Sequence, residues 1–97
     1  MNLPLGEQLE RHLKKDHRWF SKGELTRLEW KRWSPTHSMT KTFLPETVGR
    51  ALRDLEENKI VAVKYEGKNT LYKWLPQEFR SKYIPTSERV GDKLFKE

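Results

Sequence analysis

The residues with the clearest chemistry lie close together in the middle of the chain, between Glu46 and Arg53. Arg50 and Arg53 are three positions apart, so both guanidinium groups lie on one side of a helix. Such a group can bond guanine O6 and N7 through two parallel hydrogen bonds. Thr47, near the start of this helix, can bond a phosphate, which the helix dipole also favours. These residues predict recognition of nucleic acid, with Glu46 on the same exposed side.

The same residues also allow a purely structural interpretation. Opposite charges four positions apart can pair on a helix surface, and three such pairs occur here: Glu46–Arg50, Arg50–Asp54 and Arg53–Glu57. The segment from Lys41 to Lys59 holds four basic and four acidic residues, so it releases few counterions from DNA. Phosphate contacts must therefore come from other cations. We expect them from Lys22, Lys64, Lys68 and Lys73, with Lys14, Lys15 and Arg18 as further sources of charge.

Composition favours a polyanionic partner. The 97 residues suffice for one domain, and 20 basic against 14 acidic residues give a net charge of +6. No apolar run approaches the ~20 residues that a membrane span needs, and no signal peptide is evident. The chain has no cysteine, which excludes disulfides, zinc fingers and thiolate nucleophiles. We therefore expect a cytoplasmic protein that binds double-stranded DNA rather than membrane.

The elements that must position these residues follow from apolar spacing. Leu5, Leu9 and Leu13 predict a helix over 6–16. Ser21 and Glu24 form a capping box that opens a second helix, with Leu25 and Leu28 on its core side and Trp33 close to that side. A loop is expected over 34–43 because Pro35 disfavours a helix before it. Pro45 then begins a third helix over 45–58, with Val48, Ala51, Leu52 and Leu55 facing the core.

A β-hairpin is predicted after the third helix. The β-rich segments 60–65 and 70–75 flank a turn at 66–69 that contains Gly67. With Gly67 and Lys68 as the loop, Val63 and Tyr72 share one face while Lys64 and Lys73 lie on the other. Lys64, Lys68 and Lys73 would then bind phosphates or, alternatively, protect an exposed edge strand from aggregation.

The tryptophans divide into two groups. Trp19 and Trp74 fall where the fold needs apolar closure, so we expect them in the core. Trp30 points away from Leu25 on the expected second helix. Trp30 and Trp33 are therefore candidates for contact with nucleic acid or a protein.

Catalysis finds little support in the sequence. His12 and Asp16 are four positions apart and offer two metal ligands, but no third ligand accompanies them. No phosphate-cradling glycine loop and no nucleophile elbow is present. We expect no enzyme activity, no metal and no cofactor.

The run from Thr47 to Val61, T-V-G-R-A-L-R-D-L-E-E-N-K-I-V, resembles the recognition helix and first wing strand of winged helix-turn-helix regulators. The resemblance implies an α+β fold of three helices and a β-hairpin wing, with the third helix in the major groove and the wing along the backbone. It covers a domain at 3–76, which leaves 77–97 as a loose or dimerising extension. Two features differ from the family. The 34–43 loop replaces a tight turn, and Asn58 stands at the helix end where glycine is usual, able to take the αL position.

The resulting expectation is a duplex DNA-binding transcriptional regulator of bacterial, archaeal or viral origin, acting as a homodimer or with a protein partner. One alternative is a protein-interaction module that docks a partner through the 30–43 loop region. Another is binding of RNA or single strands through the wing and its aromatic residues.

Overall fold

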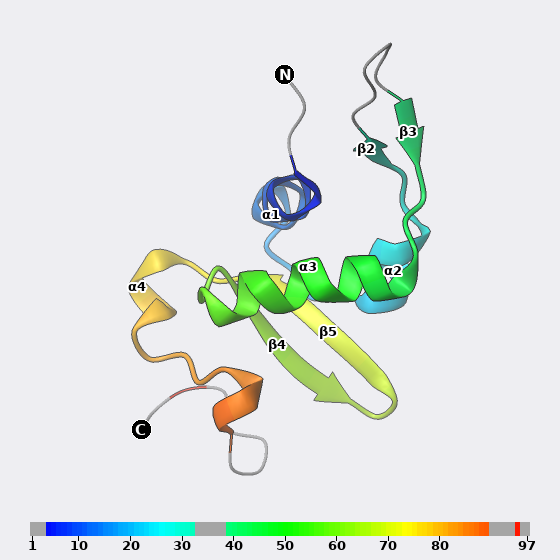
Figure 1. Cartoon of the computed structure of the whole chain (residues 1–97). Coiled ribbons are helices and arrows are strands. Elements are labelled where there is room, and N and C mark those ends of the chain that lie inside the picture. Colours follow the sequence, from blue (N-terminus) through cyan, green and yellow to red (C-terminus); the bar gives the residue numbers. More distant parts are fainter. Residues whose placement is uncertain (1–3, 33–38, 90–94, 96–97) are drawn as a thin grey trace.

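Helices and antiparallel strands alternate along the chain (Figure 1). The computed structural model describes residues 4–32, 39–89 and 95, which form an α+β fold, as predicted. The helices are α1 (Leu5–Lys15), α2 (Lys22–Arg27), α3 (Pro45–Glu57) and the short α4 (Gln77–Arg80), followed by a 3₁₀ turn at Thr86–Glu88. The strands are β1 (Phe20–Ser21), β2 (Trp30–Arg32), β3 (Met39–Lys41), β4 (Val61–Glu66) and β5 (Asn69–Trp74). No helix within these ranges is long and apolar enough to cross a membrane.

The main sheet has the strand order β1–β5–β4, and each neighbouring pair is antiparallel. Val63 lies opposite Tyr72 and Glu66 opposite Asn69, which confirms the register predicted from a two-residue loop. Gly67, the first loop residue, has a φ of 61°, as a type II′ turn requires. Because β1 pairs with the far side of β5, the segment between α1 and α2 is tied to the hairpin.

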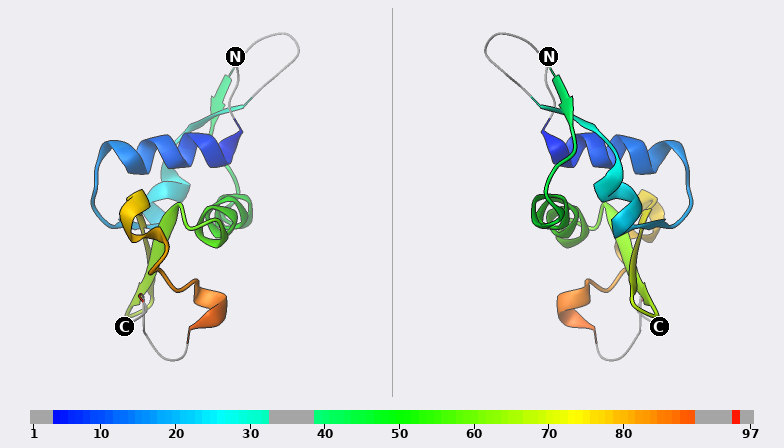
Figure 2. Two further views of the ribbon diagram at one scale, coloured as in Figure 1. Left: turned by 90° about the vertical axis from the view of Figure 1, so that its left-hand side faces the viewer. Right: turned by 90° about the vertical axis from the view of Figure 1, so that its right-hand side faces the viewer.

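The main core lies where α1, α2 and α3 meet this sheet. Leu9 and Leu13 of α1 are fully buried, which confirms the apolar stripe predicted for the first helix. Leu52 of α3 and Leu25 of α2 are buried in the same cluster, together with Val63 of β4. α3 and the 3₁₀ turn lie on one side of the β4–β5 hairpin, and α4 lies on the other (Figure 2). The hairpin therefore has two differently covered faces.

The second helix is shorter than predicted. Ser21 caps it as expected, since its hydroxyl accepts from the Glu24 amide at 3.1 Å, but the helix ends at Arg27. Trp30 begins β2, which pairs with β3 in a separate two-stranded sheet. The interpretation of Trp30 as an outward-pointing helical residue is wrong: it is 6% exposed and its indole nitrogen donates to Leu25 O at 3.1 Å. Burial of this large side chain and strand pairing outweigh helix continuation.

The predicted loop over 34–43 is therefore in part a strand. Residues 39–41 form β3, and residue 43 packs against the core. Trp33 and the 34–38 segment lie outside the described residues. The β2–β3 hairpin projects from the body in the direction opposite to the β4–β5 hairpin (Figures 1 and 2).

Both ends of α3 are defined by backbone geometry. Pro45 is the first residue of the helix, as predicted. At the other end Lys59, not Asn58, adopts the left-handed conformation, with a φ of 60°. The Ile60 amide donates to Leu55 O at 2.9 Å and the Lys59 amide to Glu56 O at 2.8 Å, the two bonds of a Schellman motif. The αL position thus lies one residue later than expected, because Asn58 still has a near-helical φ of −87°.

The expectation of a loose C-terminal tail is wrong for residues 77–89. Tyr83 is fully buried and packs with Ala62 and Leu75 in a second small cluster. β4 is an edge strand, and Tyr83 and Arg89 bond its outward-facing backbone at Val63. The tail thereby covers backbone groups that the sheet leaves unpaired.

Candidate nucleic-acid interface

The exposed face of α3 is the one predicted from its apolar spacing. Val48, Leu52 and Leu55 are buried, whereas the four predicted contact residues of this helix are exposed: Glu46, Thr47, Arg50 and Arg53. None of the three i,i+4 pairs is present among the ion pairs of the described residues. Both guanidinium groups are therefore exposed and have no carboxylate partner among the residues that the structure describes.

A polar groove of about 200 Å³ separates α3 from the β4–β5 hairpin. Arg53 lines it from the helix, and Tyr65 and Thr70 line it from the hairpin. Tyr72 also reaches this groove, and burial raises its pKa to about 12. The groove offers hydroxyl donors next to a guanidinium group, a combination suited to phosphate or base edges.

Lys22 joins this surface through Gly49. A Cβ added to Gly49 would lie 3.0 Å from Lys22 Nζ and 3.1 Å from its Cε, so the glycine leaves room for the lysine to cross α3. The space beside Gly49 is therefore filled by a side chain of the same chain. This places the Lys22 ammonium group beside the Arg53 groove.

The remaining predicted lysines are not gathered on this side. Lys64 and Lys73 lie on the opposite face of the hairpin, 4.6 Å and 5.9 Å from the ring centre of Trp19. Lys64 also pairs with Glu66 at 3.6 Å. Lys68 is exposed at the hairpin turn. The structure thus brings Lys22 to the α3 face and separates Lys64 and Lys73 from it.

A second group of cations, on the β2–β3 hairpin beside Trp30, was not among the predicted DNA contacts. We call this hairpin the basic hairpin and define it by Lys31, Arg32 and Lys41, since the sequence from Trp30 to Phe43 contains no acidic residue. The alternation of large and polar residues on either side of residues 34–38 was the available signal. Lys31 and Arg32 are exposed on β2, and Lys41 is half-buried on β3, the strand that precedes α3.

The base of the basic hairpin is fixed to the body. The Gln8 side chain donates to Lys31 O at 2.9 Å and accepts from the Lys31 amide at 2.8 Å. Trp30 anchors the same strand in the core, where its ring lies 5.4 Å from that of His12 in an edge-on contact. These contacts fix the direction in which the strands leave the core.

His12 and Asp16, the two candidate metal ligands, serve other contacts. His12 packs between the rings of Phe20 and Trp30, and Asp16 accepts from Arg18 at 3.1 Å. Arg18 also bonds Glu24 at 2.5 Å and holds the pKa of that carboxyl below its usual range. Arg18, expected as a further source of positive charge, is thus paired with two carboxylates. In the described parts of the chain no group of three potential ligands lies close enough to hold a metal ion.

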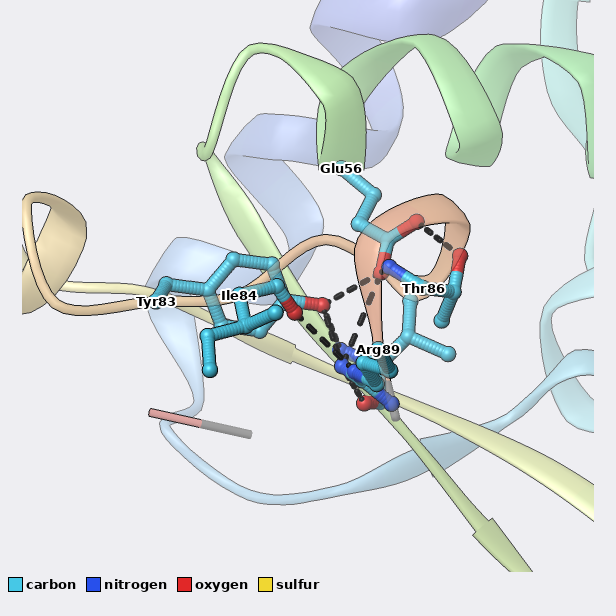
Figure 3. Close-up of polar contacts among 6 residues, drawn as sticks. Glu56, Tyr83, Ile84, Thr86 and Arg89 are labelled. Carbon is cyan, nitrogen blue, oxygen red and sulfur yellow. Dashed lines mark hydrogen bonds and ion pairs between the residues drawn. The ribbon is translucent and has the colours of Figure 1, made fainter. Parts of the chain in front are cut away.

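A buried polar network holds the C-terminal end of α3, and the sequence did not reveal it (Figure 3). We call it the C-terminal clasp and define it by Glu56, Tyr83, Thr86 and Arg89. Glu56 is 2% exposed and accepts from the Tyr83 hydroxyl and from the Thr86 hydroxyl at 2.7 Å. Arg89 lies 3.7 Å from the same carboxylate. Burial and the bond to Glu56 raise the pKa of Tyr83, so its hydroxyl stays protonated.

Comparison of the chain with protein-family models, curated proteins and solved structures finds no match.

Proposed function

We propose that this chain is a winged helix-turn-helix domain that binds duplex DNA and acts as a transcriptional regulator. The observation that carries the proposal is the exposed face of α3, whose Arg50 and Arg53 pair with no carboxylate in the described ranges 4–32 and 39–89. Support comes from the element order, in which a helix with such a face is followed directly by the β4–β5 hairpin. The pairing of β1 with β5 adds to it, because it sets the hairpin beside the helical core.

In the proposed complex the N-terminal half of α3 enters the major groove. Arg50 meets a base edge, while Thr47 and Lys22 bond phosphates. Asp54 and Glu57 lie on the C-terminal half, where their carboxylates repel the DNA backbone. The helix is therefore inserted by its first turns.

Phosphate contacts beyond α3 come from the two hairpins. The basic hairpin supplies Lys31, Arg32 and Lys41, and the turn of the β4–β5 hairpin supplies Lys68. Because the hairpins project in opposite directions, they reach the backbone on both sides of the inserted helix (Figure 1). Lys64 and Lys73, on the opposite face, take no part in this proposal.

The test measures binding to a labelled random-sequence duplex by fluorescence anisotropy at several salt concentrations. Five or six phosphate contacts give a slope of log K against log salt of about −5. A slope near zero, or no binding at low salt, would overturn the proposal and move a protein-docking role ahead. The same titration with a single strand tests the single-strand alternative. Tighter binding to the single strand than to the duplex would favour that alternative.

A further inference from the structure

A second concave site lies on the side of the β4–β5 hairpin that carries α4 (Figure 2). It is a cavity of about 470 Å³ whose lining includes five aromatic rings: His17, Trp19, Trp74, Phe79 and Phe95. We call it the aromatic pocket. Its size falls within the range of sites that hold small organic molecules, about 300–1,000 Å³. None of the residues proposed to touch DNA on α3 lines it.

The walls of the aromatic pocket are not closed by the described part of the chain. Phe79 is 46% exposed and Phe95 is 40% exposed, whereas Phe20 in the main core is 2% exposed. Flat aromatic faces left beside a cavity favour a planar apolar guest, because stacking removes both surfaces from water.

The charged side chains that line the aromatic pocket have one sign, and the imidazole of His17 lies beside them. Lys73 and Lys82 line the pocket, and no acidic residue of the described part of the chain does. Neither lysine forms an ion pair with any other described residue. Lys14 and Arg80 also stand close to the Trp74 ring, at 5.6 Å and 5.7 Å from its centre. The surroundings of the pocket therefore favour an anion.

One buried donor in the pocket wall lacks an acceptor. The indole nitrogen of Trp74 is shielded from solvent and makes no hydrogen bond within the described residues. Buried donors are normally paired, and an unpaired one costs free energy. A guest that carries an oxygen acceptor can satisfy this donor once a small shift of the indole ring exposes it to the pocket.

We propose that the aromatic pocket binds a small molecule with a planar aromatic body and a carboxylate or phosphate group. The aromatic body stacks on the walls, and the anionic group pairs with Lys73 and Lys82 and accepts from Trp74 Nε1. A neutral aromatic molecule leaves the two ammonium groups without a partner, and a cation is repelled by them. This binding does not depend on the proposed binding of DNA.

The first test compares two probes of almost equal shape, 1-naphthaleneacetate and its neutral amide, by calorimetry on the full chain. The carboxylate should bind about fivefold more tightly than the amide. An ion pair at a partly exposed site contributes up to about 1 kcal/mol, which corresponds to about fivefold in affinity. Equal affinities, or no binding of either probe, would overturn the proposal.

The second test locates the bound probe. In a proton–nitrogen correlation spectrum, the indole signal of Trp74, assigned through Trp74→Phe, should shift downfield with 1-naphthaleneacetate as its N–H gains an acceptor. An unmoved Trp74 signal at saturation would place the probe elsewhere and contradict the assignment.

Two matched lysine variants separate a local role from a general effect of charge. Lys82→Ala should weaken the carboxylate about fivefold and leave the amide unchanged. Lys68→Ala removes an exposed lysine outside the pocket and should change neither. If both variants weaken the carboxylate equally, the attraction is non-specific and the proposal fails. The aromatic pocket could instead be occupied by a second copy of the chain, which sedimentation with and without probe would detect as a dimer. Displacement of that second copy by both probes alike would contradict a dedicated anion site.

Discussion

At the scale of single residues, Arg50 and Arg53 have different surroundings although both are exposed. Arg53 lines the polar groove against the β4–β5 hairpin, and its positive charge partly offsets the rise that burial causes in the pKa of Tyr72. Arg50 does not line the groove and lies one turn from the helix start. Of the two, Arg50 is therefore the better placed to reach a base edge.

Replacing Arg50 with alanine should weaken binding to the preferred duplex by about 1–3 kcal/mol and binding to random duplex much less. Thermal stability should change little, because Arg50 makes no ion pair with any described residue. Selection from random duplexes with wild type and variant measures the first effect, and a thermal melt measures the second. Arg11→Ala, an exposed arginine on α1, is the control. Identical selected sites for all three chains would remove the base-reading role from Arg50.

The Tyr83 hydroxyl has a structural role that can be isolated. It donates to Glu56 and accepts from the Val63 amide at 2.9 Å. Arg89 also donates to this hydroxyl, at 2.7 Å. Tyr83→Phe keeps the ring and leaves all three groups short of a partner, so the free energy of unfolding should fall by about 1–3 kcal/mol. Urea titration measures it. Tyr65→Phe removes a hydroxyl from a side chain that is 59% exposed and should change stability little. Equal losses in the two variants would mean that the buried bonds add nothing to stability.

At the scale of elements, the end of α3 carries a strained residue. Lys59 occupies the left-handed region at φ 60°, which costs a residue with a Cβ about 1–2 kcal/mol relative to its helical conformation. Lys59→Gly should raise the free energy of unfolding by about 1 kcal/mol, since glycine adopts this conformation without the steric cost. Chemical denaturation of both chains checks the gain.

The neighbouring position provides the control for Lys59→Gly. Asn58 has a φ of −87°, and its side chain donates to Asp54 O at 2.9 Å. Asn58→Gly should therefore lower stability. A gain at position 58 and none at 59 would contradict the assignment of the Schellman motif to Lys59.

The basic hairpin can be tested through the salt dependence of duplex binding. Changing Lys31, Arg32 and Lys41 together to alanine should reduce the salt slope by about two to three units, one per lost phosphate contact. Folding should survive because Trp30 and the Gln8 bonds to Lys31 remain. A double alanine variant of Arg11 and Lys15, both exposed on α1, should change the slope by less than one unit. Equal changes per charge removed in both variants would show that only net charge matters.

At the scale of the whole molecule, the described chain measures 50 × 28 × 22 Å, and its two hairpins extend to opposite ends (Figure 2). The C-terminal clasp connects the end of α3 with the outer edge of β4. It does so through a buried carboxylate and guanidinium, whose side chains are 3% and 5% exposed. Removing either partner would leave a buried charge uncompensated. The tail is thus part of the folded unit that holds α3 and the hairpin together.

A chain that ends at Lys82 should expose the edge of β4. Loss of the clasp should lower stability by several kcal/mol, about 3–5, and the free backbone groups of Val63 should promote association between copies. Sedimentation velocity over a range of concentrations measures the association.

Lys64→Ala in the full chain tests the alternative that lysines protect this edge. Because the tail already pairs the Val63 backbone, this variant should sediment as the full chain does. Association of the Lys64 variant without association of the shortened chain would reverse the assignment.

The sequence by itself determined the elements whose signals are local. Leucines at fourfold spacing, Pro45 at a helix start and Gly67 between two β-rich segments each act within a few residues, so α1, α3 and the β4–β5 register were predicted correctly. The exposed face of α3 followed from the same periodicity.

Only the tertiary structure decided what depends on distant partners. Trp30 is in a strand and not in the expected helix, because pairing with β3 and packing against His12 stabilise the extended conformation. The roles of Glu56 and Arg89 arise from contacts across more than 25 residues of chain, with 26 separating Arg89 from Val63. Trp19 directly precedes β1, and the pairing of β1 with β5 brings the Trp19 ring to the face that carries Lys64 and Lys73. Helical and strand periodicities describe which face a residue lies on, but not which distant segment covers that face.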